Sequence, residues 1–131
     1  MQGQDSPREM RERVLLLEDD AGVRRSLHLM LHGAGYDVRS YSAAAALLAD
    51  PGVGDAGVLI ADYRLSDGDG VDVLRTLREQ SWNGRAVLIT AFPSPALRAT
   101  AKEAGYDLVL DKPVLQHNLL GALRERNGNV S

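Results

Sequence analysis

Carboxylates, a threonine and a lysine follow four short apolar runs of the sequence, each at the point where a run ends. The polar residues in these four places are Glu18-Asp19-Asp20, Asp62, Thr90 and Asp111-Lys112-Pro113. Two carboxylates about 4 Å apart repel each other by roughly 4 kcal/mol at an effective dielectric constant near 20. Carboxylates that folding brings together would therefore take up a proton or bind a cation.

Phosphoryl transfer is the chemistry that suits this set of side chains. Hard oxygen ligands that leave room for water suit Mg²⁺, which keeps several waters and binds phosphate oxygens readily. A metal ion and Lys112 would neutralise the charge of the moving group, and a carboxylate would act as the nucleophile. Taken singly, these residues have simpler explanations, and Asp20 is expected to cap a helix. A turn does not explain Asp62, because this residue directly follows a run typical of a buried strand.

The apolar runs that precede these residues have the composition of buried strands. They cover residues 14–17, 58–61, 86–89 and 108–110. All are rich in Val, Leu and Ile and lack the alternation of a half-exposed strand, which indicates central strands of a parallel sheet covered on both faces. Residues 36–41 mix tyrosines and a valine with polar residues, which predicts a more exposed strand at an edge.

Helical patterns of apolar residues lie between the strands. They cover residues 23–34, 43–49, 71–77, 97–104 and 115–123. Ser42 is expected to cap the second of these helices. Pro95 suits the first turn of the fourth, and Gly105 suits its end. We interpret Asp67 and Asp69 as turn residues close to the positive end of the third helix.

Strands and helices alternate five times, and this alternation predicts an α/β fold. An open parallel sheet with helices on both faces and right-handed crossovers is expected. With five strands, the favoured arrangement is the flavodoxin-like doubly wound (βα)5 fold with strand order 2-1-3-4-5. Sites in such sheets lie beyond the carboxyl ends of the strands, where the strand order reverses. The polar residues described above should meet there.

The motifs on these strands resemble those of the receiver domains of bacterial two-component response regulators. The resemblance extends over about residues 13–126. Its four matching segments are VLLLEDD at residues 14–20, DYRLSDGDG at 62–70, LITA at 88–91 and DKP at 111–113. Each segment alone is a weak indication, but all four in this order and on these strands are specific.

The resemblance implies a role for each site residue. Asp62 would be the phosphoacceptor, with Thr90 hydrogen-bonding the phosphoryl group and Lys112 pairing with it. Mg²⁺ would be held by Asp19 and Asp62 directly, by Glu18 through a bound water, and by the backbone carbonyl of Arg64. The Lys112–Pro113 bond is often cis in this family.

One position departs from the family pattern. Receiver domains usually carry an aromatic residue three positions before the lysine, and its rotamer follows the hydroxyl residue on the fourth strand. Val109 occupies that position here. Tyr106 lies at the start of the strand and is not expected to act as a substitute. The usual coupling between hydroxyl and ring is therefore not expected, whereas phosphorylation itself is.

Other classes of protein fit less well. A flavodoxin-like cofactor binder should have a loop rich in Ser, Thr and Gly after the first strand, where this chain has three acids. A haloacid-dehalogenase-type phosphatase needs a second aspartate two residues after the nucleophile, where Arg64 stands. The remaining alternative is a pseudo-receiver, which has lost phosphorylation and acts as a protein-interaction module. The chain would not be a conventional enzyme, since it would promote only its own phosphorylation and dephosphorylation.

Composition restricts the partners and the organisation of the chain. The 131 residues have a net charge of −3, no cysteine and no apolar run long enough to span a membrane. Neither nucleic acid nor a membrane surface is therefore expected as a partner, and the absence of cysteine fits a cytoplasmic location. We expect a flexible arm over residues 1–12, a receiver domain over 13–126, and a polar tail or linker over 127–131. Expected partners are a histidine kinase or histidine phosphotransfer protein, a downstream output domain or protein, and a second copy in a phosphorylation-dependent homodimer.

Overall fold

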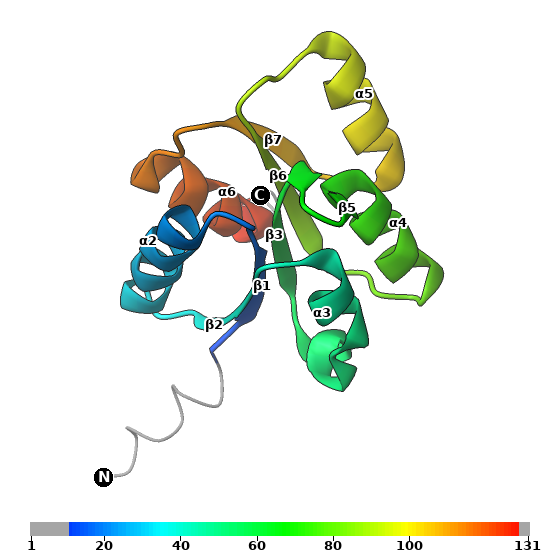
Figure 1. The fold of residues 1–131 in the computed structure, drawn as a ribbon. Helices are drawn as coiled ribbons and strands as arrows, with labels where there is room; N and C mark the ends of the chain where they lie inside the picture. Colours follow the sequence, from blue (N-terminus) through cyan, green and yellow to red (C-terminus); the bar gives the residue numbers. More distant parts are fainter. Residues whose placement is uncertain (1–10, 129–131) are drawn as a thin grey trace, which may run out of the picture.

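The computed structural model describes residues 11–128 in backbone and 11–124 in side chains. Five parallel strands form one sheet in the order β2-β1-β3-β6-β7 (Figure 1). The strands are β1 (Arg13–Leu17), β2 (Asp37–Tyr41), β3 (Val58–Asp62), β6 (Arg85–Thr90) and β7 (Leu108–Asp111). In order along the chain this is the arrangement 2-1-3-4-5, so the predicted flavodoxin-like fold is confirmed.

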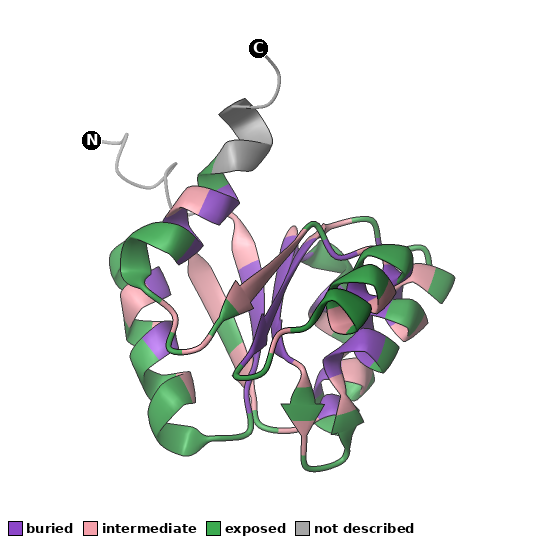
Figure 2. Cartoon of the chain, turned by 90° about the horizontal axis from the view of Figure 1, so that it is seen from above, coloured by how far each residue is buried: buried purple, intermediate pink, exposed green. Residues whose placement is uncertain are grey.

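Helices cover both faces of the sheet. They are α2 (Ala21–Gly33), α3 (Ala44–Ala49), α4 (Gly70–Glu79), α5 (Pro95–Ala104) and α6 (Gln116–Gly128), with a 3-10 helix η1 (Pro51–Asp55) after α3. Apolar residues of α2 and α6 pack on one face, and those of α3, α4 and α5 pack on the other. Figure 2 shows the buried residues concentrated in the sheet and on the inner sides of the helices.

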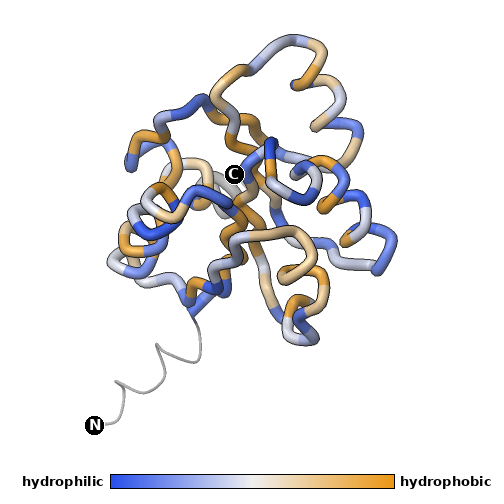
Figure 3. Tube along the Cα trace, viewed as in Figure 1, coloured by the Kyte–Doolittle hydropathy of each residue, from blue (hydrophilic) through white to orange (hydrophobic). Residues whose placement is uncertain are grey.

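Side-chain alternation along β1 supplies both layers of the core. Val14 and Leu16 point into the layer under α2 and α6, whereas Leu15 and Leu17 point into the other layer. Apolar residues therefore run continuously along the central strands, as a parallel sheet covered on both faces requires, and Figure 3 shows this apolar centre. β2 has only partly buried or exposed residues and lies at one edge, as its composition predicts.

The start of α3 differs from the prediction. The N-cap position is Ala43, and no side chain of the preceding segment caps the helix, so the assignment of Ser42 was wrong. Instead, the carboxylate of Asp67 accepts hydrogen bonds from the backbone N–H groups of Ala44 and Ala45, at 2.9 and 3.0 Å. The cap thus comes from a distant turn. Asp20 caps α2 and Asp69 caps α4, each through its own side chain.

Asp67 belongs to a two-stranded antiparallel hairpin that the sequence did not reveal. Its strands are β4 (Arg64–Leu65) and β5 (Gly68–Asp69), and they lie between β3 and α4. Gly68 has a φ of 150°, a conformation that glycine adopts easily. A second difference concerns the last helix, because Leu115 precedes α6 and is exposed, whereas Leu119 and Leu123 are buried as expected.

The Asp67 cap should make stability depend on pH in acid. The N–H groups of Ala45 and Ala44 lower the pKa of the Asp67 carboxyl below its ordinary value. A lowered folded-state pKa stabilises the fold fully above the unfolded-state pKa, and the contribution disappears as pH falls through the folded-state pKa. Asp67→Ala is therefore expected to be less stable than the wild type at neutral pH. The difference should begin to shrink below about pH 4.

Urea unfolding of both proteins between neutral pH and acid measures this difference. Asp55→Ala is the matched control, since Asp55 is an exposed aspartate at the end of η1. A difference between wild type and Asp67→Ala that stays constant down to strongly acidic pH would show that the carboxylate does not act as a cap.

Candidate functional site

The carboxyl ends of the strands bring the predicted residues to one edge of the sheet. Leu17 is level with Ala61, Asp62 with Ile89, and Thr90 with Asp111, so β1, β3, β6 and β7 end close together. Glu18 follows β1, Asp62 and Thr90 end β3 and β6, and Lys112 follows β7. The chain reverses its strand order between β1 and β3, which is where ligands bind in open α/β sheets.

Lys112 connects two buried carboxylates. Its Nζ atom donates to Asp62 Oδ2 at 3.0 Å and forms an ion pair with Glu18 Oε1 at 3.1 Å. Glu18 and Asp62 are only 1% and 7% exposed. Burial raises the pKa of Glu18 above its ordinary value. Burial lowers the pKa of Lys112, but the two carboxylates outweigh it, so the net shift is upward and the lysine is charged at neutral pH.

Three carboxylates lie close enough together to hold one metal ion. Oxygen atoms of Glu18, Asp19 and Asp62 lie within 4.8 Å of one another. Glu18 Oε1 is buried and lies in an ion pair with Lys112, but it accepts no hydrogen bond of good geometry from the residues that the structure describes. This carboxylate oxygen can therefore take a further partner such as a cation or water. Its position beside two other hard oxygen donors fits Mg²⁺.

Thr90 and Lys112 are joined through the backbone. The Lys112 N–H donates to the Thr90 carbonyl at 2.9 Å, so the end of β6 fixes the start of the lysine-bearing turn. Thr90 is 3% exposed, and its Oγ1 accepts a hydrogen bond from the Phe92 N–H at 3.2 Å. The Lys112–Pro113 bond is cis, as the resemblance implies.

Arg64 lies on the hairpin next to the acceptor strand. It begins β4, pairs with Asp69 and has an exposed side chain. The role of the Arg64 backbone carbonyl as a metal ligand stays a prediction. Val109 is partly buried against the layer of α3, α4 and α5.

Two contacts near the site have no counterpart in the sequence patterns. Arg24, on the first turns of α2, donates through Nη1 to the carbonyls of Glu18 and Asp19, at 2.9 and 3.4 Å. Buried Tyr106 donates its hydroxyl to the carbonyl of Gly70 at 2.7 Å. Gly70 has no room for a side chain, since a Cβ there would lie 2.6 Å from the Asp62 carbonyl oxygen. Neither contact follows a periodic pattern that the sequence could have displayed.

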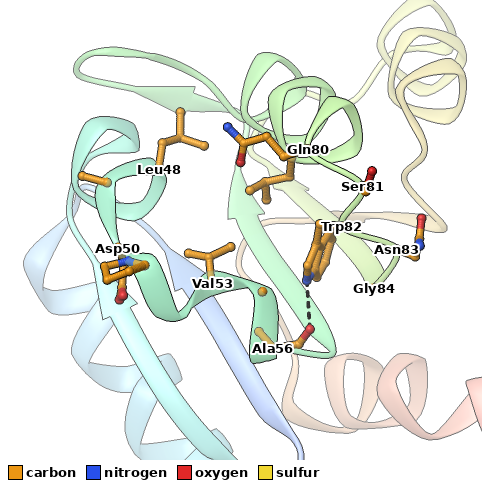
Figure 4. Close-up of a pocket in the computed structure, with 13 residues that line it drawn as sticks. Leu48, Asp50, Val53, Ala56, Gln80, Ser81, Trp82, Asn83 and Gly84 are labelled. Atoms are coloured by element: carbon orange, nitrogen blue, oxygen red, sulfur yellow. Dashed lines mark hydrogen bonds between the residues drawn. The ribbon is translucent and has the colours of Figure 1, made fainter.

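A hollow at the other end of the sheet carries no comparable chemistry. It lies between the segment that leads into β3 and the segment that leads into β6 (Figure 4). Trp82 lies in it and donates its indole N–H to the carbonyl of Ala56 at 2.8 Å. Asp50 is the acidic residue among those that line the hollow, and its carboxylate already accepts hydrogen bonds from the Tyr41 hydroxyl and the Gly52 N–H. The carboxyl ends of the strands therefore form the candidate functional site.

The fold and the acidic edge define an α/β receiver module with its site at the reversal of strand order. The family model of the response regulator receiver domain matches residues 14–124. The chain belongs to this family. Every helix that the structure describes is too short or too polar to cross a membrane.

Curated relatives agree with this assignment, and a solved structure shares the fold. Response regulator protein TmoT of Ectopseudomonas mendocina is 31% identical over 111 residues, which cover 85% of this chain and 50% of that protein. Transcriptional regulatory protein FixJ of Rhizobium meliloti is 33% identical over 100 residues, which cover 76% of this chain and 49% of that protein. The chain thus spans about half the length of these relatives. A CheY-like receiver domain protein from Methanospirillum hungatei JF-1 shares the fold, with a TM-score of 0.80, 24% identity and coverage of 88% and 93% of the two chains.

Proposed function

We propose that this chain accepts a phosphoryl group on Asp62 and changes its interactions in response. The single observation that carries the proposal is the arrangement around Lys112, whose ammonium lies 3.0 Å from Asp62 and 3.1 Å from Glu18 at the end of the parallel sheet. A carboxylate that is to receive a phosphoryl group needs positive charge beside it, and a fixed lysine supplies this. Membership of the receiver family supports the same function.

The donor we propose is the phosphohistidine of a histidine kinase or of a histidine phosphotransfer protein. A carboxylate oxygen of Asp62 attacks the phosphorus atom, and the bond from phosphorus to the donor imidazole nitrogen breaks. The imidazole nitrogen takes up one proton, and Asp62 becomes an acyl phosphate. When bound at Glu18, Asp19, Asp62 and the Arg64 carbonyl, Mg²⁺ would supply further positive charge to the phosphoryl oxygens.

Residues of this chain bind and orient the transferred group. Lys112 would exchange its contact with the Asp62 carboxylate for one with a phosphoryl oxygen. Thr90 Oγ1 accepts a hydrogen bond from the Phe92 N–H, so its own hydrogen is available for donation to the phosphoryl group. Hydrogen bonds to charged groups contribute roughly 1.5–3 kcal/mol each. Two such bonds are sufficient to invert a conformational equilibrium with a gap of a few kcal/mol.

Output from the site is proposed to reach a partner or a further domain. The relatives are about twice as long as the region that they share with this chain, and an output domain or protein fits that difference. We propose the receiver domain over residues 13–126 and a cytoplasmic location, as expected for a partner of a histidine kinase. Incubation with acetyl phosphate and Mg²⁺, followed by peptide mass spectrometry, tests the proposal, and the phosphoryl group should map to the peptide that contains Asp62.

Magnesium ions should stabilise the folded protein through the carboxylate cluster. A ligand that binds only the folded state at tenfold above its dissociation constant adds about 1.4 kcal/mol to the free energy of unfolding. Mg²⁺ is therefore expected to raise the melting temperature, and Asp19→Asn should weaken binding strongly because it removes a carboxylate from the cluster. Scanning calorimetry measures the melting temperature, and calorimetric titration measures the Mg²⁺ affinity.

Asp20→Asn is the matched control for this experiment. Asp20 is the neighbouring acid and caps α2, and asparagine caps helices equally well. The control should bind Mg²⁺ like the wild type. Absence of Mg²⁺ binding by the wild type in the millimolar range would instead favour the pseudo-receiver.

A further inference from the structure

We propose that Arg24 is a positioning residue that orients the acidic pair Glu18-Asp19 for the cation. The inference rests on the proposed function, since it concerns the same site. Arg24 does not touch the reacting atoms. It acts on the backbone that carries two of the three carboxylates of the cluster.

Arg24 contacts backbone carbonyl groups of the turn between β1 and α2. Nη1 donates to the Glu18 carbonyl at 2.9 Å and to the Asp19 carbonyl at 3.4 Å. The Arg24 backbone N–H donates to the Asp20 carbonyl at 2.9 Å. Arg24 therefore contacts the carbonyl groups of three successive residues, and its side chain is partly buried over the turn.

The other contacts of this turn involve the Glu18 carboxylate, whereas those of Arg24 involve the backbone. Lys112 lies 3.1 Å from Glu18 Oε1, and the Asp20 N–H donates to Glu18 Oε2 at 3.1 Å. The Glu18 carboxylate is thus fixed at both oxygens. Asp19 makes no such side-chain contact among the interactions described, and its side chain is exposed. Its orientation therefore depends on the backbone, which Arg24 holds at the Asp19 carbonyl.

Two effects of Arg24 on cation binding oppose each other. Its positive charge repels a cation, so removal of the charge would strengthen binding. Its hydrogen bonds orient the ligands, so their removal would weaken binding. Partners that orient metal ligands typically change metal affinity by 10-fold to 100-fold when they are mutated. Since the guanidinium lies on the carbonyl side of the turn and is partly solvated, we expect its orienting effect to exceed the repulsion.

Arg24→Met tests the inference against the neighbouring Arg25→Met. Arg25 is an exposed arginine on the same turn of α2, and its replacement removes the same charge from the protein. We expect Arg24→Met to bind Mg²⁺ about tenfold more weakly by calorimetric titration, and Arg25→Met to bind like the wild type. The Mg²⁺ concentration for half-maximal phosphorylation by acetyl phosphate should rise by the same factor, whereas the rate at saturating Mg²⁺ should not change.

Arg24→Lys provides the rescue. A single nitrogen makes both side-chain contacts, so a lysine ammonium, with three N–H groups, can replace it. Most of the Mg²⁺ affinity should return in this variant. A metal-free measurement complements the titration, because amide hydrogen exchange at Asp19 and Asp20 should be faster in Arg24→Met than in either the wild type or Arg25→Met.

The possible outcomes separate this inference from the proposed function. If the wild type neither binds Mg²⁺ nor takes up a phosphoryl group, the proposed function is wrong. If the wild type does both, unchanged or tighter Mg²⁺ binding by Arg24→Met overturns the inference alone. A lowered melting temperature with unchanged Mg²⁺ affinity would also overturn it, because it would assign Arg24 a purely structural role.

Discussion

Asp62→Asn is expected to abolish phosphorylation while the domain stays folded. The amide oxygen of asparagine is not a nucleophile, and the other buried carboxylate of the site, Glu18, is held by Lys112 and by the Asp20 N–H. The fold should persist because asparagine has the same shape and still offers an oxygen to Lys112. The substitution also removes one of three negative charges that lie within 4.8 Å of one another, so stability without Mg²⁺ should not fall.

Labelling by acetyl phosphate or by a phosphorylated kinase, read by mass spectrometry, measures this effect. Asp69→Asn is the matched control, since Asp69 lies on the hairpin that follows Asp62 and caps α4, and asparagine retains the cap. The control should be labelled like the wild type. Labelling of Asp62→Asn at the wild-type level, or a phosphoryl group on another residue of the wild type, would refute the assignment of Asp62.

The second large effect is expected on stability, from Arg78→Met. Arg78 donates through Nη1 to the carbonyls of Trp82 and Gly84, at 3.1 and 2.8 Å, and through Nη2 to the carbonyl of Gly105 at 2.9 Å. Its guanidinium also lies 5.2 Å from the centre of the Trp82 ring. One side chain thus joins the end of α4 to the segment before β6 and to the turn between α5 and β7.

Loss of these contacts should lower the free energy of unfolding by about 3 kcal/mol or more. Each hydrogen bond to a charged group contributes roughly 1.5–3 kcal/mol, and the three carbonyls would lose their donor together. Methionine preserves the apolar part of the side chain, so the loss of stability is attributable to the guanidinium group. Urea unfolding measures it. Arg75→Met, on the same helix, is the control, because Arg75 is exposed and makes a single ion pair with Asp72. Its effect should stay within about 0.5 kcal/mol, and an equal loss in both variants would contradict the prediction.

Local patterns in the sequence were sufficient to predict the sheet and the members of its site. The central strands are continuous apolar runs, so their position and burial follow from composition. Once the strand order is known, the residues after β1, β3, β6 and β7 must meet, which is why Glu18, Asp62 and Lys112 could be named together. The three carboxylates and the lysine lie together as this argument requires.

Contacts between distant segments could not be predicted in the same way. Ser42 was the obvious cap for α3 by local rules, yet Asp67, more than twenty residues further along the chain, takes that role. The sequence has many arginines, a residue type that usually lies at the surface. Nothing local indicates that Arg78 donates hydrogen bonds to three backbone carbonyls. Such contacts depend on where folding places the loops, and no periodic pattern in the sequence indicates them.

The hydrogen bond of Tyr106 is a further contact that the sequence did not indicate. Its place at the start of a strand gave no reason to expect more than packing. In the structure its hydroxyl contacts the first residue of α4, Gly70, which itself packs against the backbone of Asp62. Val109 stands where receiver domains usually carry an aromatic residue, and the nearby Tyr106 is buried and hydrogen-bonded.

The Asp67 cap has a consequence for the order in which the domain assembles. α3 has six residues, fewer than a helix needs to persist alone in water. Its first N–H groups find their acceptor only after the chain has continued through β3 and the hairpin. We therefore expect the first turn of α3 to be capped only once the hairpin after β3 has formed. By the same dependence, local opening of this hairpin would remove the acceptor of the first N–H groups of α3, so we expect the two segments to open together.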